Sequence, residues 1–415
     1  MQSVNDTPST DFSQYSILNS LFSTGHSGLL TMDYLKIPLS QPSISALEVA
    51  CVTDAVESGW VSSKGDYIDR FEEIFADYCG TKYAISTSSG TTALHLALAS
   101  YGIGPGDEVI VPDITFIATA NAVTYTGAQA VLVDIDTETL CIDVTKVEQA
   151  ITSKTKAIIA VHLYGHPANI PVLKAIAQTH GIIVIEDAAE AHGAMVQGKR
   201  TGALGDCGVF SFYGNKIVTC GEGGMLTTDD EALYNRALHL RSQAMSPTQR
   251  YWHTEVGFNY RMTNLQAALG FAQMKRINEF VQKKKTIFHW YQQWLSAQDH
   301  QLPVQAVRLN RTAPWAQNVF WQVCLEVNGW STLERDRFLV LLAEKGIESR
   351  PYFYPISDMP MYAATARYET AIAHRVSQQG LNLPSYFDMT QEDVETVGSA
   401  ITHCLKRVST PTLQG

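Results

Sequence analysis

Short apolar runs alternate with helical patterns along most of this chain, and that alternation limits the folds it can adopt. The runs are rich in β-branched residues and too short for buried helices, so we predict strands at residues 109–111, 130–133, 157–161, 182–185, 210–212 and 223–228. Between them, helical patterns occupy residues 91–99, 118–125, 144–150 and 171–179. Continuous apolar strands separated by helices indicate a mainly parallel sheet covered on both faces, which is a three-layer αβα domain.

The pattern changes in the last third of the chain. A helical stretch over residues 264–295 leads out of the α/β region, and a strand at 320–326 then mixes with helices at 333–344 and 391–405. We therefore predict a large domain over residues 32–285 and a smaller α+β domain over 286–415, with residues 37–60 packing on the small domain. Residues 1–31 are polar and weakly periodic, which favours a mobile extension and leaves Met32 as a possible start.

Composition excludes several classes of function. The formal net charge is −11, and the strongest basic run, Lys283-Lys284-Lys285, is expected to be a solvated helix face. Nucleic acid is therefore not expected as a partner. The seven cysteines are scattered without metal-binding spacing, so we expect neither disulfides nor a metal site, and a reducing cytoplasm fits best. No apolar run is long enough for a membrane span, and the first basic residue is Lys36, so no signal peptide is expected.

Small residues open a strongly helical segment at Ser88-Ser89-Gly90-Thr91-Thr92. A helix N-terminus offers unpaired N–H groups and a partial positive charge, which together suit a phosphate. Gly90 allows close approach of the backbone, and hydroxyls of Ser89 or Thr91 can add donors. An ordinary serine or threonine N-cap explains the same residues, so this segment alone does not decide between the two.

An acidic residue, Asp187, follows the predicted strand at 182–185. Side chains at the carboxyl end of a buried parallel strand lie at the edge where α/β sheets bind ligands. A carboxylate there can pair with a protonated pyridine nitrogen, which makes the ring of pyridoxal phosphate (PLP) an electron sink. The alternative is an aspartate that caps a turn. Nearby His192 is expected to be a packed histidine rather than a catalyst.

A single lysine, Lys216, lies in an aromatic and glycine-rich turn soon after the strand at 210–212. A lysine sheltered from water can be held as a neutral amine that condenses with an aldehyde. Ser211 precedes it and can reach the same phosphate as Gly90. The alternative is a surface lysine in a flexible loop.

These three segments occur in the order found in fold-type-I PLP enzymes, and here the sequence resembles one family of them, the DegT-type sugar aminotransferases. The resemblance extends from Ile37 to about Leu405. The motifs that carry it are residues 102–112 (GIGPGDEVIVP), 115–119 (TFIAT), 186–193 (EDAAEAHG), 211–224 (SFYGNKIVTCGEGG) and 259–262 (NYRM).

The resemblance implies a catalytic role for Lys216, which would form the Schiff base with PLP and later move the proton. It also implies that Asp187 pairs with the pyridine nitrogen and that Phe116 stacks on the ring. Glu190 stands where many relatives carry glutamine near the ring hydroxyl, which leaves its hydrogen bond open.

The remaining cofactor contacts are also implied by the resemblance. Gly90, Thr91 and Ser211 would hold the phosphate. Asn259 would reach the phosphate from the neighbouring subunit, so a homodimer with a shared active site is expected.

The substrate is less constrained. Residues 161–167 (VHLYGHP), Glu190 and residues 350–355 (RPYFYP) resemble the GDP-perosamine synthase branch, which aminates a GDP-linked 4-keto-6-deoxyhexose. Substrate contacts are then expected from Arg350, Tyr352 and Phe353, although the aromatic run can equally serve as domain-packing core. Residues 356–358 (ISD) depart from the Leu-His pair of that branch, which leaves room for another keto or aldehyde sugar, including one without a nucleotide.

The expected function is PLP-dependent transamination of a sugar carbonyl with L-glutamate as amino donor, in the biosynthesis of a bacterial surface amino sugar. Two rivals remain. A sugar dehydratase with the same cofactor carries histidine in place of the lysine, and Lys216 is present. A silent PLP-binding regulatory protein should show damaged catalytic positions or a DNA-binding segment, and residues 1–31 contain no Lys or Arg.

Overall fold

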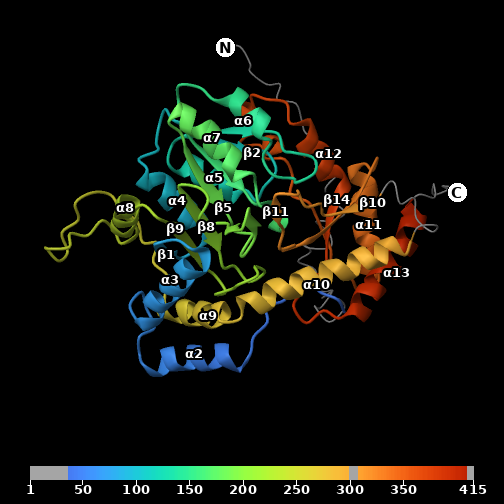
Figure 1. Ribbon diagram of the computed structural model, residues 1–415, viewed down its shortest axis with the longest axis horizontal. Coiled ribbons are helices and arrows are strands. Elements are labelled where there is room, and N and C mark those ends of the chain that lie inside the picture. The colour runs from blue at the N-terminus through green and yellow to red at the C-terminus, as the bar shows by residue number, and fades with distance from the viewer. Residues whose placement is uncertain (1–35, 299–306, 409–415) are drawn as a thin grey trace, which may run out of the picture.

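Seven strands form the central sheet of the computed structural model, which describes residues 36–298 and 307–408 (Figure 1). In spatial order they are β1 (Tyr83–Thr87), β9 (Gly224–Thr228), β8 (Cys207–Ser211), β5 (Ile183–Asp187), β4 (Thr155–Val161), β2 (Glu108–Pro112) and β3 (Gln129–Val133). β9 runs antiparallel to both neighbours, and the remaining pairings are parallel. The predicted mainly parallel sheet is confirmed.

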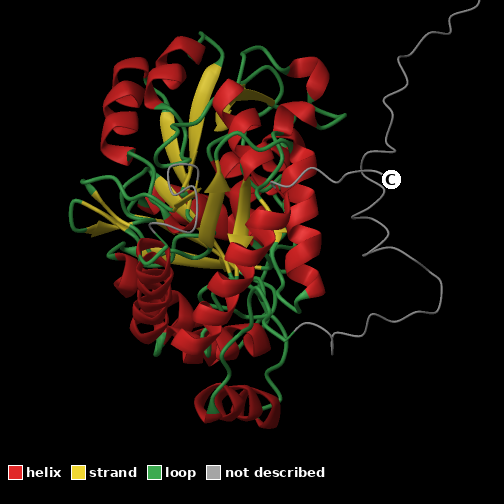
Figure 2. Cartoon of the chain, turned by 90° about the vertical axis from the view of Figure 1, so that its right-hand side faces the viewer, coloured by secondary structure: helices red, strands yellow, loops and turns green. Residues whose placement is uncertain are grey.

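Successive residues of these strands are buried on opposite faces of the sheet. On β2, Val109 and Val111 pack with one apolar cluster, whereas Ile110 packs with another. The first cluster includes α4 (Gly90–Ser100), α5 (Ala118–Tyr125) and α8 (Glu231–Arg241). The opposite face is covered by α6 (Val144–Ala150), α7 (Ile170–His180), α3 (Asp66–Cys79) and α9 (Asn264–Met274). The predicted three layers are therefore present, with helices on both sides of the strands (Figure 2).

The predicted helices of this region are confirmed, and α4, α6 and α7 each begin at a residue whose side chain caps the helix. α5 and α6 coincide with the predicted ranges, and α4 and α7 extend one residue further at each end. Asn169 caps α7 by accepting a hydrogen bond from the Val172 amide, and Gly181 ends the helix with a φ of 65°.

A second, four-stranded antiparallel sheet forms the smaller α+β part. Its order is β10 (Val307–Leu309), β12 (Val323–Val327), β14 (Gly380–Leu383) and β13 (Arg350–Pro351). The helices around it are α10 (Ile277–Ser296), α11 (Thr332–Glu344), α12 (Ala371–Gln379) and α13 (Gln391–Val408). In a small third sheet, β6 (Met195–Val196) lies between β11 (Ala316–Gln317) and β7 (Lys199–Arg200). The predicted boundary at 285/286 falls inside α10, which runs from α9 to the small sheet (Figure 1).

Residues 37–60, which were predicted to pack on the small domain, contact both parts of the chain. Ile37 pairs with Ile347 and is buried in the core of the smaller part, whereas α2 (Ala46–Glu57) packs against α9. Figures 1 and 2 both place α2 at the lower edge of the molecule. The expected extension over residues 1–31, and Met32, lie outside the described residues.

Two predictions for the segment after residue 264 were wrong. The single helix over 264–295 is two helices, because the chain turns at Arg276, whose guanidinium binds the buried carboxylate of Glu48 on α2 at 3.0 Å. Lys284 does not belong to a solvated face: it is 8% exposed, and its Nζ donates to the carbonyls of Trp321 and Ser385. Three lysines in a row cannot share one helix face, since each is rotated by roughly 100° from the last.

Candidate active site

The carboxyl ends of β4 and β5 meet at one edge of the central sheet, where α/β sheets bind ligands. Asp187 is the last residue of β5 and is 5% exposed. Its carboxylate accepts hydrogen bonds from Thr119 Oγ1 at 2.8 Å and from the Ala189 amide at 3.3 Å. Burial raises the pKa of Asp187, while these hydrogen bonds and the charge of Lys216 oppose that rise. The carboxylate is thus oriented and surrounded by protein.

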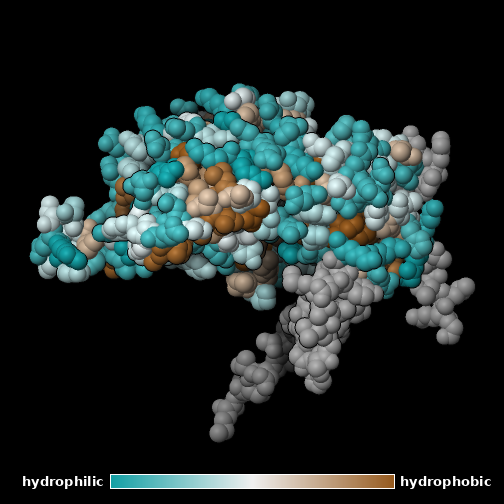
Figure 3. All heavy atoms as spheres, turned by 90° about the horizontal axis from the view of Figure 1, so that it is seen from below, coloured by the Kyte–Doolittle hydropathy of each residue, from teal (hydrophilic) through white to brown (hydrophobic). Residues whose placement is uncertain are grey.

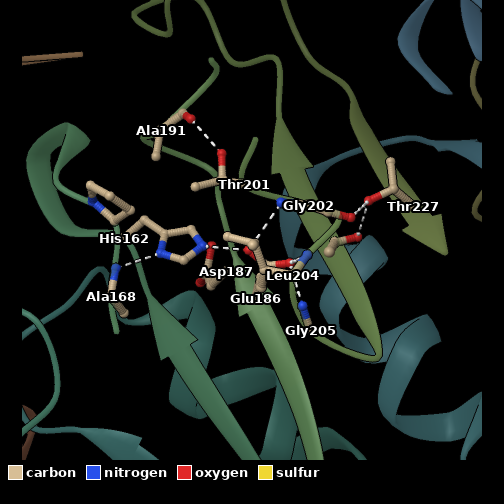
Figure 4. A network of polar contacts seen from close by, with 12 residues as sticks. His162, Ala168, Glu186, Asp187, Ala191, Thr201, Gly202, Leu204, Gly205 and Thr227 are labelled. Atoms are coloured by element: carbon tan, nitrogen blue, oxygen red, sulfur yellow. Dashed lines mark hydrogen bonds and ion pairs between the residues drawn. The ribbon is translucent and has the colours of Figure 1, made fainter. Parts of the chain in front are cut away.

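Glu186, one residue earlier, anchors the end of β5 (Figure 4). Its buried carboxylate accepts backbone N–H bonds of 2.8–3.0 Å from three residues of the loop 202–205. His162 supplies the fourth contact: its Nδ1 accepts from the Ala168 amide, so Nε2 carries the proton and lies 3.0 Å from Glu186 Oε2. The His162 amide also donates to the Asp187 carbonyl at 3.0 Å. These contacts fix the backbone that presents Asp187.

Lys216 lies in the turn after β8, and its side chain is only 11% exposed. Its Nζ is 3.4 Å from Glu190 Oε1 and 4.0 Å from the centre of the Trp321 ring. The other oxygen of Glu190 accepts a hydrogen bond from the Tyr164 amide at 3.0 Å. Burial raises the pKa of Glu190, and the nearby Lys216 opposes the rise. The lysine is therefore not a flexible surface residue, and an acidic group accompanies it.

The predicted phosphate seat lies at the start of α4, close to the end of β8. A Cβ added at Gly90 would lie 2.8 Å from Ser211 Cβ, so only glycine allows this approach. Ser89 is the N-cap, and its hydroxyl accepts from the Thr92 amide at 3.2 Å. Thr91 is half-buried in the first turn. Ser89 therefore caps the helix, and Gly90, Thr91 and Ser211 lie around its N-terminus, where their contact with a phosphate stays a prediction.

Aromatic side chains of the large domain contact aromatic side chains of the smaller part. Phe116 is 56% exposed, and its ring centre is 6.0 Å from that of Phe353. Phe353 in turn stacks on Tyr164 at 5.4 Å, and its amide donates to the Tyr164 hydroxyl at 2.9 Å. Tyr352 is 1% exposed and packs on the other side of Tyr164 at 5.0 Å. Of the two aromatic residues expected to contact substrate, Tyr352 thus lies in the core and Phe353 lies beside Phe116.

Two predicted site residues lie apart from this cluster. Arg350 is exposed on β13 and pairs with Glu348 at 2.9 Å. Asn259 is exposed at the base of the segment that follows α8, and its side-chain oxygen accepts from Arg261 at 3.1 Å. No contact joins either of them to Lys216 or Asp187 among the described residues of the single chain.

His192 is packed, as the sequence indicated. Its ring is fully buried against Phe210 and Phe212, at centre distances of 5.3 and 5.7 Å. Burial lowers the pKa of His192 to about 3, so the ring is neutral near pH 7.

Ser357, one of the residues 356–358 that differ from the GDP-perosamine synthase branch, has a structural role. Ser357 donates through its amide and hydroxyl to the buried carboxylate of Asp113, at 2.7 and 2.6 Å. Thr370 adds a third donor at 2.5 Å. Burial raises the pKa of Asp113, and these donors oppose that rise. Ser357 thus ties the segment after Pro355 to the end of β2.

Sequence reasoning missed three contacts of this site. Thr119 orients Asp187, Tyr164 binds Glu190 through its amide, and Trp321 covers Lys216. Thr119 and Tyr164 both lie in motifs noted above, so their positions were available without their roles. Nothing in the local pattern around Trp321 indicates its contact with a lysine so distant in sequence.

Comparison with known proteins places this geometry in a family. The model of the DegT/DnrJ/EryC1/StrS aminotransferase family matches residues 42–402. The chain belongs to that family. It is therefore a PLP-dependent aminotransferase that acts on a sugar with an amino donor.

Individual relatives agree in length and fold. A GDP-perosamine synthase of Caulobacter vibrioides is 45% identical over 373 residues, covering 90% of this chain and 99% of the relative. One from Escherichia coli O157:H7 is 42% identical and covers 86% and 95%. A sugar aminotransferase, Spr1654 of Streptococcus pneumoniae, solved in its PLP form, superposes with a TM-score of 0.84 at 26% identity, covering 90% of this chain and 100% of that one. No helix of residues 36–298 or 307–408 has the length and apolar character of a membrane span.

Proposed function

We propose that this aminotransferase moves the amino group of L-glutamate to the keto group of a GDP-linked 4-keto-6-deoxyhexose, for a bacterial surface amino sugar. The observation that carries the chemistry is the placement of Lys216 beside Glu190 at the sheet edge that also presents Asp187. The substrate class is supported by the similarity to two GDP-perosamine synthases.

The residues at this edge fit PLP. Gly90 has no side chain, so the start of α4 lies close to Ser211. The backbone N–H groups at this helix N-terminus, beside Thr91, suit a phosphate. Asp187 accepts two hydrogen bonds and retains lone pairs for a pyridinium N–H. When bound, PLP supplies the electron sink that lets a proton leave the carbon bearing the amine. In this arrangement Phe116 would cover one face of the ring.

Lys216 is the group that we assign to proton transfer. Its amine is the only lysine amine that contacts Glu190 among the described residues, and its side chain is largely enclosed. A neutral amine there accepts a proton and returns it to a neighbouring carbon, so one side chain serves as base and then as acid. Glu190 orients that amine and is itself held by the Tyr164 amide. The donors to Asp187 and the charge of Lys216 oppose the rise in pKa that burial causes, and they thereby favour the charged form that would pair with the pyridine nitrogen.

We propose that the active unit is a homodimer in which Asn259 completes the phosphate site of the partner. Asn259 pairs through its backbone with Ser242, the residue that follows α8. The segment between these two residues projects away from the body of the chain (Figure 1). That segment exposes Tyr251, Trp252 and Val256. Apolar surface also gathers on the side of the molecule formed by α2, as Figure 3 shows, where the exposed residues are Ile44, Leu47, Val49, Val56, Trp60 and Val61. Patches of this kind mark association surfaces.

A sugar aminotransferase acting without a nucleotide is the second candidate, because residues 356–358 (ISD) depart from the Leu-His pair of the GDP-perosamine synthase branch. Exposed Phe116 and half-buried Phe353 together suit the apolar face of a sugar ring or a base in either case. Arg350 is exposed on β13 and pairs with Glu348 through one terminal nitrogen, so its remaining N–H donors suit a diphosphate.

A single-turnover assay tests the proposal. The holoenzyme is converted to its amine form with L-glutamate, freed of glutamate, and mixed with GDP-, UDP- and dTDP-linked 4-keto-6-deoxysugars and with free sugar aldehydes. Return of the PLP absorbance and an amino sugar in the mass spectrum should occur fastest with the GDP-linked sugar. Faster reaction with a free aldehyde would favour the second candidate, and reaction with none of them would refute both.

A further inference from the structure

Trp321, which comes from the smaller part of the chain, makes two contacts with the lysine turn. The centre of its ring lies 4.0 Å from Lys216 Nζ, which is the distance of a close cation–π contact. Its indole Nε1 donates to the carbonyl of Asn215 at 2.8 Å, one residue before the lysine. Trp321 is 4% exposed, so its ring has little freedom to leave. One side chain therefore holds both the backbone and the amine of Lys216.

The backbone of Trp321 is itself held by a second buried lysine. Lys284 Nζ donates to the Trp321 carbonyl at 2.9 Å and to the Ser385 hydroxyl at 3.0 Å. The Ser385 hydroxyl returns a hydrogen bond to the Trp321 carbonyl at 3.3 Å. The indole also lies nearly parallel to the Tyr164 ring, with an angle of 17° and a distance of 6.5 Å between the ring centres. The ring is thus fixed from its backbone and from its face.

The backbone on either side of this contact is strained. Phe320 and Tyr164 both have positive φ, 52° and 53°, which is unfavourable for bulky residues. A Cβ at Gly165 would lie 2.6 Å from the Trp321 amide nitrogen, so the two turns are pressed together. Asn318 stabilises the Phe320 turn by accepting from its amide at 2.7 Å. Strained backbone that the surroundings hold in place is typical of functional sites.

We propose that Trp321 is a positioning residue for Lys216: its ring gives the free amine a fixed resting position next to Glu190 between proton transfers. This inference rests on the role proposed above for Lys216. The ring face favours a positive charge on the lysine nitrogen, and the bond to Asn215 keeps the turn from drifting. The reaction therefore starts from one lysine geometry instead of many.

Three substitutions in the full-length holoenzyme test this assignment. Trp321→Leu removes the ring and the N–H, whereas Trp321→Phe keeps an aromatic face and removes only the N–H. Trp315→Leu is the matched control, because Trp315 is a half-buried tryptophan of the same segment that packs on His166. For each protein one measures the PLP content, the rate at which saturating L-glutamate bleaches the PLP absorbance, and the midpoint of the pH dependence of that rate, because the lysine amine is free during this reaction.

The expected result is a bleaching rate at least tenfold lower in Trp321→Leu, with the midpoint of its pH profile lower by about 0.5–1 pH unit because a cationic lysine nitrogen loses its ring partner. Trp321→Phe should recover the midpoint and most of the rate, and Trp315→Leu should match the wild type in both. A Trp321→Leu enzyme with wild-type rate and midpoint overturns the inference, as does a Trp321→Phe enzyme that shifts the midpoint as far. If Trp321→Leu does not retain PLP, the Phe variant decides alone. A wild-type protein that glutamate does not bleach would instead refute the proposed function.

Discussion

Replacing Glu186 by glutamine tests how the end of β5 is held. The side chain keeps its size, but one carboxylate oxygen becomes an NH₂ group. Oε1 faces the amides of Leu204 and Gly205, and Oε2 faces the Gly202 amide and the ring of His162. Either orientation of the amide therefore directs N–H groups at two donors. The histidine cannot relieve the conflict by moving its proton, because its Nδ1 already accepts a hydrogen bond.

The size of the effect follows from those contacts. Each buried donor that loses its acceptor costs ~1–3 kcal/mol, and two are affected in either orientation. The remaining bonds also weaken, because the acceptor is no longer charged. We expect the free energy of unfolding of Glu186→Gln to fall by ~3–5 kcal/mol.

Urea unfolding of the holoenzyme, followed by tryptophan fluorescence at one fixed concentration of protein and PLP, measures this loss. Glu148→Gln is the matched control, since Glu148 is exposed on α6, and its change should stay within ~0.5 kcal/mol. A Glu186→Gln protein within ~1 kcal/mol of the wild type would refute the view that this carboxylate anchors the strand end.

Three further predictions concern the phosphate seat, the strand-end acid and the buried lysine. Gly90→Ala places a Cβ 2.8 Å from Ser211 Cβ, so PLP should bind at least about tenfold more weakly by absorbance titration, whereas Gly104→Ala, whose Cβ meets nothing closer than 3.7 Å, should bind it normally. Asp187→Asn should lower kcat by about 10²–10⁴-fold in the transamination assay while the urea midpoint stays level or rises, since a neutral amide costs less to bury; an active Asn variant contradicts the pairing role. Burial lowers the pKa of Lys284 from 10.5 to about 7, so between those values the unfolded chain binds more protons and stability rises with pH. From pH 7 to pH 9, the free energy of unfolding measured in urea should rise by ~2–3 kcal/mol more for the wild type than for Lys284→Met. Equal changes in the two proteins would contradict the lowered pKa.

Much of the large domain was predictable because its signals are local. The strands of the parallel sheet are short apolar runs, and α5 and α6 match their predicted ranges. β1 was not predicted, because Ile85 is its only large aliphatic residue and its polar side chains are buried by partners elsewhere. Ser86, for example, bonds to Glu72 of α3 through both its amide and its hydroxyl. Such a strand is defined by tertiary contacts that no local pattern encodes.

Some residues of the site were likewise predictable from the sequence, and others were not. Asp187, Lys216 and Glu190 were named from the order of motifs, and the structure brings them to one place. Trp321 and Lys284 could not be assigned, because their roles depend on how the smaller part docks and on a turn with positive φ at Phe320. The substrate contacts remain proposals, and the buried position of Tyr352 leaves it a part of the core.

The central claim is that Lys216 carries the transamination, and one absorbance measurement tests it most directly. Wild-type holoenzyme mixed with excess L-glutamate should lose its PLP absorbance and release one equivalent of 2-oxoglutarate per site. Lys216→Ala should bind PLP and keep its fold, yet bleach about 10³-fold or more slowly, because Lys216 supplies the only lysine amine beside Glu190 among the described residues. Lys285→Met, a substitution on α10 away from Glu190, should behave as the wild type. A Lys216→Ala protein that bleaches at a rate close to the wild type would contradict the account.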